Sequence, residues 1–163
     1  MVGLVELGLY LKRSPELKRS PDGGHMHYVG DDPDLGYAAK PLAEGAASLE
    51  LGNELIYSTV YAFDGSGRRI TSGAPDGAST SVLCFGGSYM LGEGLAQEET
   101  LPSQLQKLWS QRSAEAEMLR SPVALNYGLH GWGPHQMLAL IRSGRAPGPS
   151  DPPPVAALYW AIE

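Results

Sequence analysis

The residues that could do chemistry are concentrated in two glycine-rich segments. The first is Phe85-Gly86-Gly87-Ser88-Tyr89 and continues to Gly94, and the second runs from Asn126 to Gln136. A serine in such a segment can attack an ester carbonyl, because glycine lets the backbone approach a substrate closely. The chemistry that these segments suggest is acyl transfer through the hydroxyl of Ser88.

Taken alone, the first segment leaves other interpretations open. It is not a Gly-x-Ser-x-Gly nucleophile turn, because Tyr89-Met90 follow the serine. A glycine-rich loop can also hold a phosphate, but the Lys-Ser/Thr pair of a P-loop is absent. A tight turn with an incidental serine fits the segment equally well.

The elements around these segments predict a parallel sheet. Short, continuously apolar runs at Val82–Phe85, Val123–Asn126 and Val155–Ile162 are typical of strands buried on both faces. Helical patterns lie between them, one capped by Thr100 and one that begins at Pro134. Functional residues in such α/β sheets gather beyond the carboxyl ends of the strands, which is where both glycine-rich segments lie.

The chain before this region has a different character. Residues 12–46 are rich in Pro, Gly, Asp and Ser, and we expect them to be mainly irregular. A hairpin is predicted around Gly52-Asn53, followed by a strand whose alternating face is Leu55, Tyr57, Thr59, Tyr61 and Phe63. The predicted organisation is an N-terminal helix and irregular segment (1–29), a small antiparallel β unit (30–75) and an α/β region (80–163).

The two glycine-rich segments, in this order and spacing, resemble blocks I and II of the SGNH (GDSL) hydrolases. Gly86-Gly87-Ser88 stands where that family has Gly-Asp-Ser, so Gly87 replaces the aspartate, and Asn126 to Gly131 match Asn-x-x-x-x-Gly. The flanking sequence is similar to a branch with a small β segment before the hydrolase domain. The matching stretches are Asp34-Leu35-Gly36-Tyr37, Lys40-Pro41, Asp64 with Gly67 and Arg69, Gly92-Glu93-Gly94, Glu99-Thr100-Leu101-Pro102 and Gly133-Pro134-His135-Gln136.

The resemblance implies a three-layer, flavodoxin-like parallel sheet and a serine esterase. Ser88 would be the nucleophile, and the backbone N–H groups of Ser88 and Gly131 would form the oxyanion hole. Gly87, Asn126, His130 and Trp132 would line the substrate site. We expect no cofactor and no metal.

Two elements of the family pattern have no counterpart in the sequence. Block III would begin at about Glu163, and the Asp-x-x-His of block V, which supplies the catalytic base, would lie further on. Asp22-Gly23-Gly24-His25 spells Asp-x-x-His but precedes the β unit, so we interpret it as coincidence. The 80–163 region is therefore expected to be the N-terminal half of a hydrolase domain, with low activity by itself.

Other titratable residues fit structural roles better than chemical ones. His25 and His27 could form a two-ligand metal site, although solvated side chains are commoner. His130 is the one candidate replacement base, and His135 is expected to be structural or to line the site. Glu93 and Glu98-Glu99 fit a solvated loop and a helix N-terminus, and Cys84 fits the core.

Composition and charge restrict the classes of partner and the cellular setting that we expect for the protein. The net charge of −6 argues against nucleic acid, and the single cysteine excludes an intrachain disulfide. Met1–Leu11 is shorter than the roughly 20 residues that span a bilayer, so an amphipathic helix is favoured over the tail of a membrane anchor. The chain as given would be cytoplasmic, or extracytoplasmic or membrane-anchored if an anchor precedes it.

Three hypotheses of function remain. The first is an esterase that acts on a small acyl ester, such as an acetylated carbohydrate. The second is a non-catalytic relative that acts as a binding module, and the third is a flavodoxin-like domain that binds a phosphate or nucleotide at Gly86–Ser88. A three-stranded sheet exposes at least one edge, so we also expect a possible dimer through that edge.

Overall fold

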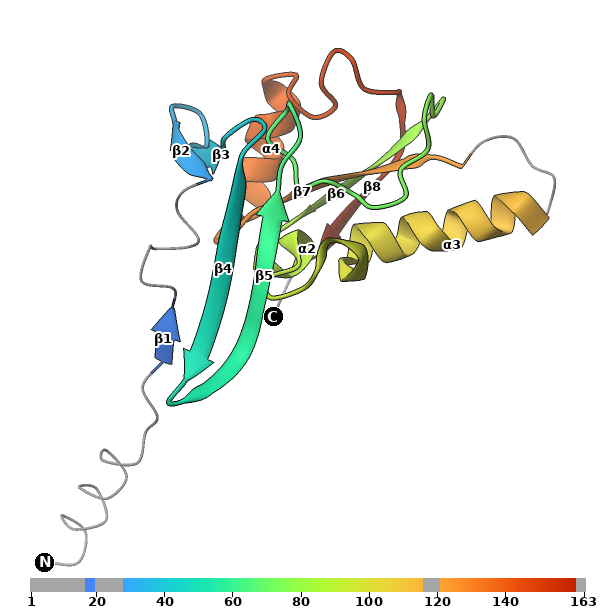
Figure 1. The fold of residues 1–163 in the computed structure, drawn as a ribbon. Helices are drawn as coiled ribbons and strands as arrows, with labels where there is room; N and C mark the ends of the chain where they lie inside the picture. Colours follow the sequence, from blue (N-terminus) through green and yellow to red (C-terminus); the bar gives the residue numbers. More distant parts are fainter. Residues whose placement is uncertain (1–16, 20–27, 116–120, 161–163) are drawn as a thin grey trace, which may run out of the picture.

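The computed structural model describes residues 17–19, 28–115 and 121–160 (Figure 1). It is a mixed α/β structure with one parallel sheet and two small antiparallel sheets. The elements are, in chain order, β1 (Leu17–Arg19), β2 (Val29–Asp32), β3 (Gly36–Ala39), β4 (Glu44–Leu51), β5 (Glu54–Ala62), β6 (Ser81–Gly86), α2 (Ser88–Leu91), the 3-10 helix η1 (Gln97–Glu99), α3 (Leu101–Glu115), β7 (Val123–Gly128), α4 (Pro134–Arg142) and β8 (Pro154–Trp160).

The parallel sheet has the order β7-β6-β8. The central strand β6 is completely buried, as its continuously apolar sequence predicts. In the register of the sheet, Gly86 at the end of β6 lies opposite Gly128 of β7 and Trp160 of β8. All three strands therefore finish at the same edge, and the segments that follow β6 and β7 leave the sheet side by side.

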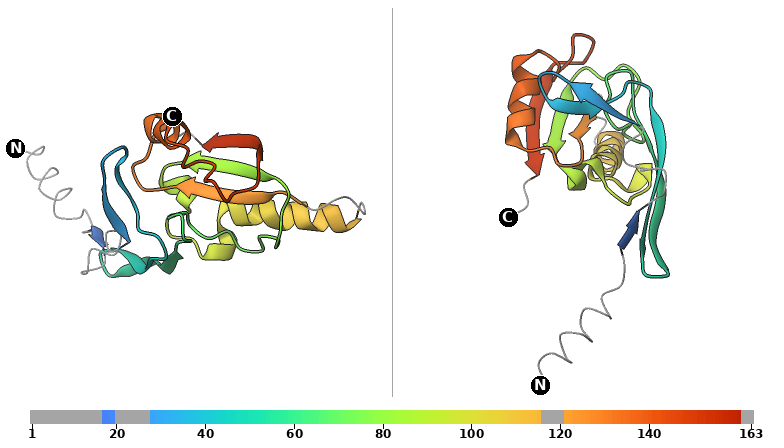
Figure 2. Two further views of the ribbon diagram at one scale, coloured as in Figure 1. Left: turned by 90° about the horizontal axis from the view of Figure 1, so that it is seen from above. Right: turned by 90° about the vertical axis from the view of Figure 1, so that its left-hand side faces the viewer.

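Helices cover the two faces of β6 and β7 (Figure 2). On one face, Leu140 of α4 packs with Leu83, Phe85, Leu125 and Tyr127. On the other face, α2 and α3 pack over the opposite side chains of the same strands. Helix α3 begins where the sequence predicts, because the Oγ1 of the buried Thr100 accepts the N–H of Ser103 at 3.4 Å.

The antiparallel part packs against the loops of the parallel part. Strands β4 and β5 form the predicted hairpin around Gly52, and β1 pairs with the outer side of β4, while β2 and β3 form a separate hairpin. Its aromatic residues Tyr28, Tyr61 and Phe63 share a buried core with Leu91 and Leu129, which lie in the segments after β6 and β7. One hydrophobic core therefore joins the β unit to the carboxyl edge of the parallel sheet.

Two predictions about buried and irregular segments were wrong. Strand β8 forms, but all seven of its residues are exposed rather than buried, because α3 and α4 pack over β6 and β7 and no described helix covers β8. The expected irregular structure of residues 12–46 is wrong at β1, whereas β2, β3 and the start of β4 fall almost entirely within the predicted antiparallel β unit (30–75). Strands β1, β2 and β3 have only three or four residues each, which is too short to leave a clear periodicity in the sequence.

Some predictions fall outside the described residues, including the N-terminal helix, His25 and His27, and the end of the third strand at Ile162. The dimer through a sheet edge stays a prediction. In the described part of the chain, no helix combines the length and the apolar character needed to cross a bilayer.

Gly128 is predicted to be essential for the close packing of α2 on β7. A Cβ at this position would lie 2.3 Å from the backbone N of Leu91 and 2.6 Å from the carbonyl carbon of Met90. Because both contacts are with backbone, Gly128→Ala should lower the free energy of unfolding by about 1–3 kcal/mol in urea denaturation. Gly65→Ala is the matched control, since no atom lies within 4 Å of its added Cβ. Equal stability of the two variants would contradict this packing.

Candidate active site

Ser88 lies at the point where β6 ends and α2 begins. Because Ser88 is the first residue of α2, its N–H belongs to the first turn, whose N–H groups have no acceptor within the helix. The carbonyl of Ser88 accepts the N–H groups of Gly92 and Glu93, both at 2.9 Å. The serine is thus held in a short, tightly bonded turn at the carboxyl end of the central strand.

The segment after β7 lies directly against this turn. Leu129 donates its N–H to the carbonyl of Gly86 at 3.3 Å, and a Cβ on Gly87 would lie 3.2 Å from the carbonyl oxygen of Trp132. Gly131 has a φ of 70°, a conformation that favours glycine. The two glycine-rich segments therefore meet at the edge of the sheet.

A cavity of about 280 Å³ opens at this meeting point, and we call it the Ser88 cavity. It brings together four of the residues that the sequence singled out, namely Gly87, Ser88, Gly131 and Trp132. Tyr89, Tyr159 and Trp160 complete its lining. A hydroxyl at the start of a helix next to a glycine turn is an arrangement that can offer a nucleophile and backbone donors to one carbonyl group.

Tyr37 of β3 fixes the segment that carries Gly131. Its hydroxyl donates to the carbonyl of His130, and its own carbonyl accepts the indole N–H of Trp132 at 3.2 Å. A Cβ on Gly131 would lie 2.7 Å from the Tyr37 hydroxyl oxygen. The β2–β3 hairpin therefore sets the position of the Gly131 turn.

Arg69 fixes the segment that follows Ser88. Its buried guanidinium donates to the carbonyls of Leu91, Gly92 and Leu95, each at 2.7 Å. The carbon of the guanidinium lies 4.6 Å from the ring centroid of Tyr61, a cation–π distance. Burial lowers the pKa of Arg69 below its usual value. Arg69 thus ties the chain after α2 to the β unit.

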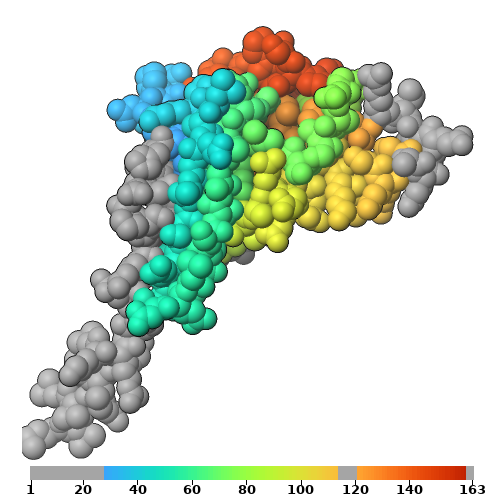
Figure 3. Space-filling view, viewed as in Figure 1, coloured from blue at the N-terminus to red at the C-terminus, as the bar shows by residue number. Residues whose placement is uncertain are grey.

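The predicted alternating face of β5 reinforces this attachment. Tyr61 accepts the N–H of Gly94 through its hydroxyl oxygen at 2.9 Å, Thr59 donates to the carbonyl of Leu95 at 3.1 Å, and Tyr57 donates to Glu93 at 3.2 Å. Burial raises the pKa of Tyr57, as does the neighbouring charge of Glu93, so its hydroxyl stays a donor. Alternate residues of one strand face therefore hold Glu93, Gly94 and Leu95 at the end of residues 87–95, which we call the Ser88 segment. Figure 3 shows the β4–β5 hairpin lying against this part of the chain.

Asn126 and His130 lie away from the Ser88 cavity. The side chain of Asn126 is buried in β7, and its Oδ1 accepts the N–H of Gly128 at 2.9 Å. The imidazole of His130 lies beside the rings of Tyr28 and Tyr61, with centroid distances of 6.4 and 6.0 Å, and its Nδ1 is 3.5 Å from Oε2 of Glu93. Neither described histidine, His130 or His135, lines the Ser88 cavity.

Three other residues that the sequence singled out, Cys84, Glu99 and His135, do not line the Ser88 cavity. Cys84 is fully buried, and burial raises the pKa of its thiol to about 12, which fits the predicted core role. Glu99 accepts the N–H of Ala96 at 3.0 Å at the start of η1. His135 is exposed at the beginning of α4.

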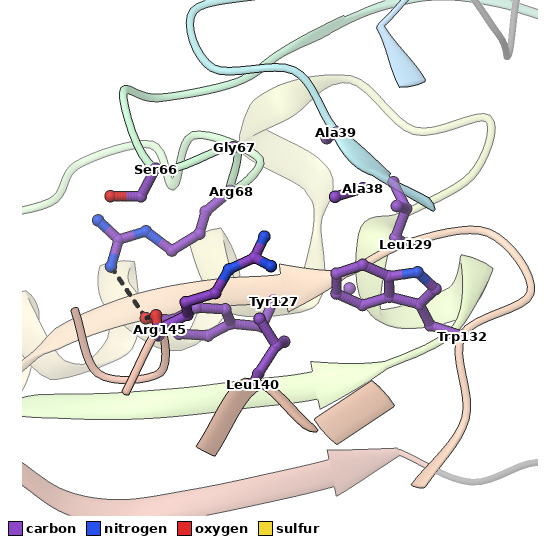
Figure 4. A pocket seen from close by; sticks show the side chains of 11 residues that line it. Ala38, Ala39, Ser66, Gly67, Arg68, Tyr127, Leu129, Trp132, Leu140 and Arg145 are labelled. Atoms are coloured by element: carbon purple, nitrogen blue, oxygen red, sulfur yellow. Dashed lines mark hydrogen bonds between the residues drawn. The ribbon is translucent and has the colours of Figure 1, made fainter. Parts of the chain in front are cut away.

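A second cavity is lined by Leu129 and Trp132 of residues 129–133, which we call the Gly131 segment, and by Arg68 and Tyr127 (Figure 4). It is too small for a substrate. Its volume is about 30 Å³, the space of a single water molecule. Arg68 points toward the hydroxyl of Tyr127 in Figure 4 and donates to it at 3.2 Å, and it also pairs with Asp151 at 2.6 Å. This network holds the loop that leads into β8.

Sequence reasoning missed several residues at the site. Tyr159 and Trp160 line the Ser88 cavity because β8 ends at the same edge as β6, and their place at the end of a predicted strand was a usable signal. The sequence marks Arg69 only as part of a family-like stretch. Its role depends on three carbonyls that lie 22 to 26 residues further along the chain, which no local pattern reveals.

Replacing Arg69 should weaken the whole structure. Arg69→Met leaves three carbonyls without their donor, so we expect the free energy of unfolding to fall by about 3 kcal/mol in urea denaturation. Arg112→Met is the control, because Arg112 is exposed on α3 and should change the stability little. A loss no greater than that of the control would show that the Arg69 contacts do not hold the segment.

Comparison of the sequence with protein-family models and with curated proteins finds no match. The likeness to SGNH hydrolases therefore stays a resemblance between short blocks.

Proposed function

We propose that the protein is a serine esterase of the SGNH type, which acts through Ser88 on a small acyl ester such as an acetylated carbohydrate. The single observation that carries the proposal is the Ser88 cavity, where the serine hydroxyl and the Gly131 turn meet at the carboxyl edge of a parallel sheet. Block I and block II are far apart in the sequence, and their meeting is what the resemblance requires.

The strand order supports the corresponding fold. Counted along the chain, the parallel strands are arranged second, first, third, which is how the flavodoxin-like order 2-1-3-4-5 begins. Ligands of such sheets bind outside the carboxyl ends, between the first and third strands. The Ser88 cavity lies between the ends of β6 and β8, which is that point.

The proposed reaction follows from these groups. The Oγ of Ser88 attacks the ester carbonyl carbon, and the carbonyl oxygen becomes an oxyanion that accepts the N–H groups of Ser88 and Gly131. The bond to the alcohol oxygen then breaks, and the alcohol leaves with a proton while the acyl group stays on Ser88. Water attacks this acyl-enzyme in turn, which releases the acid and restores the hydroxyl.

The attack needs a base that takes the proton of Ser88 and later gives it to the alcohol. No described histidine lines the Ser88 cavity, and His130 is engaged near Glu93 and two tyrosine rings. The reaction therefore needs a base that is not among the described residues lining the Ser88 cavity, and we propose that this base reaches Ser88 from the open side of the cavity. Imidazole added in solution should be able to take this role.

Acetylation of Ser88 tests the proposal. The chain is incubated with p-nitrophenyl acetate, with and without added imidazole, and the modified residue is identified by mass spectrometry of peptides. We expect one acetyl group on Ser88, formed faster with imidazole. Ser88→Ala should abolish it, and Ser79→Ala, a change at an exposed serine, should not. A label spread over several nucleophiles, unchanged in Ser88→Ala, would contradict the proposal and favour a binding module.

Gly131→Ala tests the oxyanion donor separately. The added Cβ meets the Tyr37 hydroxyl, and alanine disfavours a φ of 70°, so the turn must move. Loss of one donor costs about 100- to 1000-fold in rate, and we expect acetylation of Ser88 to slow within that range. An unchanged rate in a folded variant would show that Gly131 does not contribute.

A further inference from the structure

A second and larger groove opens on the other side of Ser88. It has a volume of about 530 Å³ and lies between the β4–β5 hairpin and the chain after α2. Leu49 and Tyr57, which are cross-strand partners in the hairpin, form one wall, and Leu95 with Glu93 forms the other. We call it the hairpin groove. Figure 3 shows the hairpin lying alongside this part of the chain.

The hairpin groove and the Ser88 cavity share two residues, Ser88 and Tyr89. An ester bound for attack has its carbonyl carbon at the Ser88 hydroxyl and its oxygen toward Gly131, so its acyl and alcohol halves must diverge from that point. The two hollows on either side of Ser88 match this requirement. The hairpin groove is the larger and therefore suits the larger half, which for a small acyl ester is the alcohol.

The lining of the hairpin groove indicates the chemistry of its occupant. Leu49, Leu95 and the rings of Tyr57 and Tyr89 offer carbon surfaces, on which the C–H faces of a sugar ring can pack. Among the described residues that line it, Glu93 alone carries a formal charge. Its carboxylate accepts the Tyr57 hydroxyl at 3.2 Å and lies 3.5 Å from Nδ1 of His130, which does not line the groove. A fixed carboxylate accepts hydroxyl donors and repels an anion.

We propose that the hairpin groove binds the alcohol half of the substrate as a neutral, ring-shaped polyol, with a preference over its uronate counterpart. The acyl half then lies in the Ser88 cavity. This assignment rests on the proposed esterase function, and it gives the β unit a role in substrate selection in addition to its role in holding the Ser88 segment.

Binding can be measured without turnover. The isotope-labelled Ser88→Ala chain is titrated by NMR with methyl β-D-glucopyranoside and with methyl β-D-glucuronide, which differs by its carboxylate. We expect the glucoside to shift the amides of Tyr57, Glu93 and Leu95, and the glucuronide to bind about tenfold more weakly because Glu93 repels it.

Variants of the groove wall complete the test. Leu49→Ala and Leu95→Ala each remove part of the carbon surface and should weaken glucoside binding about tenfold. Leu55→Ala is the matched control, because Leu55 is 58% exposed on the same hairpin and does not line the groove. Two independent wall variants are used so that a folding defect in one leaves the other informative, and melting curves identify such a defect.

The outcomes separate this inference from the esterase proposal. Suppose that Ser88 is acetylated. The groove assignment is then overturned, and the esterase proposal stands, if the glucoside does not bind, if its shifts are confined to the Ser88 cavity, or if the glucuronide binds more tightly. Glucoside binding that depends on Leu49 and Leu95, without acetylation of Ser88, would support the groove as a sugar site and overturn the esterase proposal.

Discussion

The buried guanidinium of Arg69 is the constraint on which the rest of the structure depends. A charge removed from water must be surrounded by acceptors, and Arg69 finds them in the carbonyls of Leu91, Gly92 and Leu95. These carbonyls can face one point only when the chain after α2 curls tightly around it. The position of Ser88, one turn earlier, follows from that curl, because its carbonyl accepts the N–H groups of Gly92 and Glu93.

The β unit contacts and holds both segments of the candidate site, the one that carries Ser88 and the one that carries Gly131. Strand β5 and Arg69 hold the Ser88 segment, and Tyr37 of β3 holds the Gly131 segment through its hydroxyl and its carbonyl. Tyr28, Tyr61 and Phe63 pack with a leucine from each segment in one core. An oxyanion hole built from two separate backbone N–H groups needs such support, since its donors must already point at the site before substrate binds.

Features that depend on neighbours in sequence could be predicted, and features that depend on distant packing could not. The strand at Val82–Phe85, the Gly52-Asn53 turn and the Thr100 cap each carry a local signal, and the structure confirms them. The burial of β8 was predicted wrongly, because an apolar strand is buried only if something covers it. The meeting of Ser88 with Gly131 followed from the parallel topology, whereas the placement of His130 beside Glu93 depends on a core between distant aromatic residues.

In the proposed reaction, Ser88 attacks a carbonyl whose oxygen is held by the backbone N–H groups of Ser88 and Gly131. A crystal structure of the chain after reaction with a small alkyl phosphonate ester tests it most directly, because the phosphonyl group has the shape and charge of the tetrahedral intermediate. We expect phosphorus bonded to the Oγ of Ser88, with one oxygen about 2.7–3.1 Å from the backbone nitrogen atoms of both Ser88 and Gly131. A phosphonyl group on another residue, or an oxygen that points away from Gly131, would contradict it.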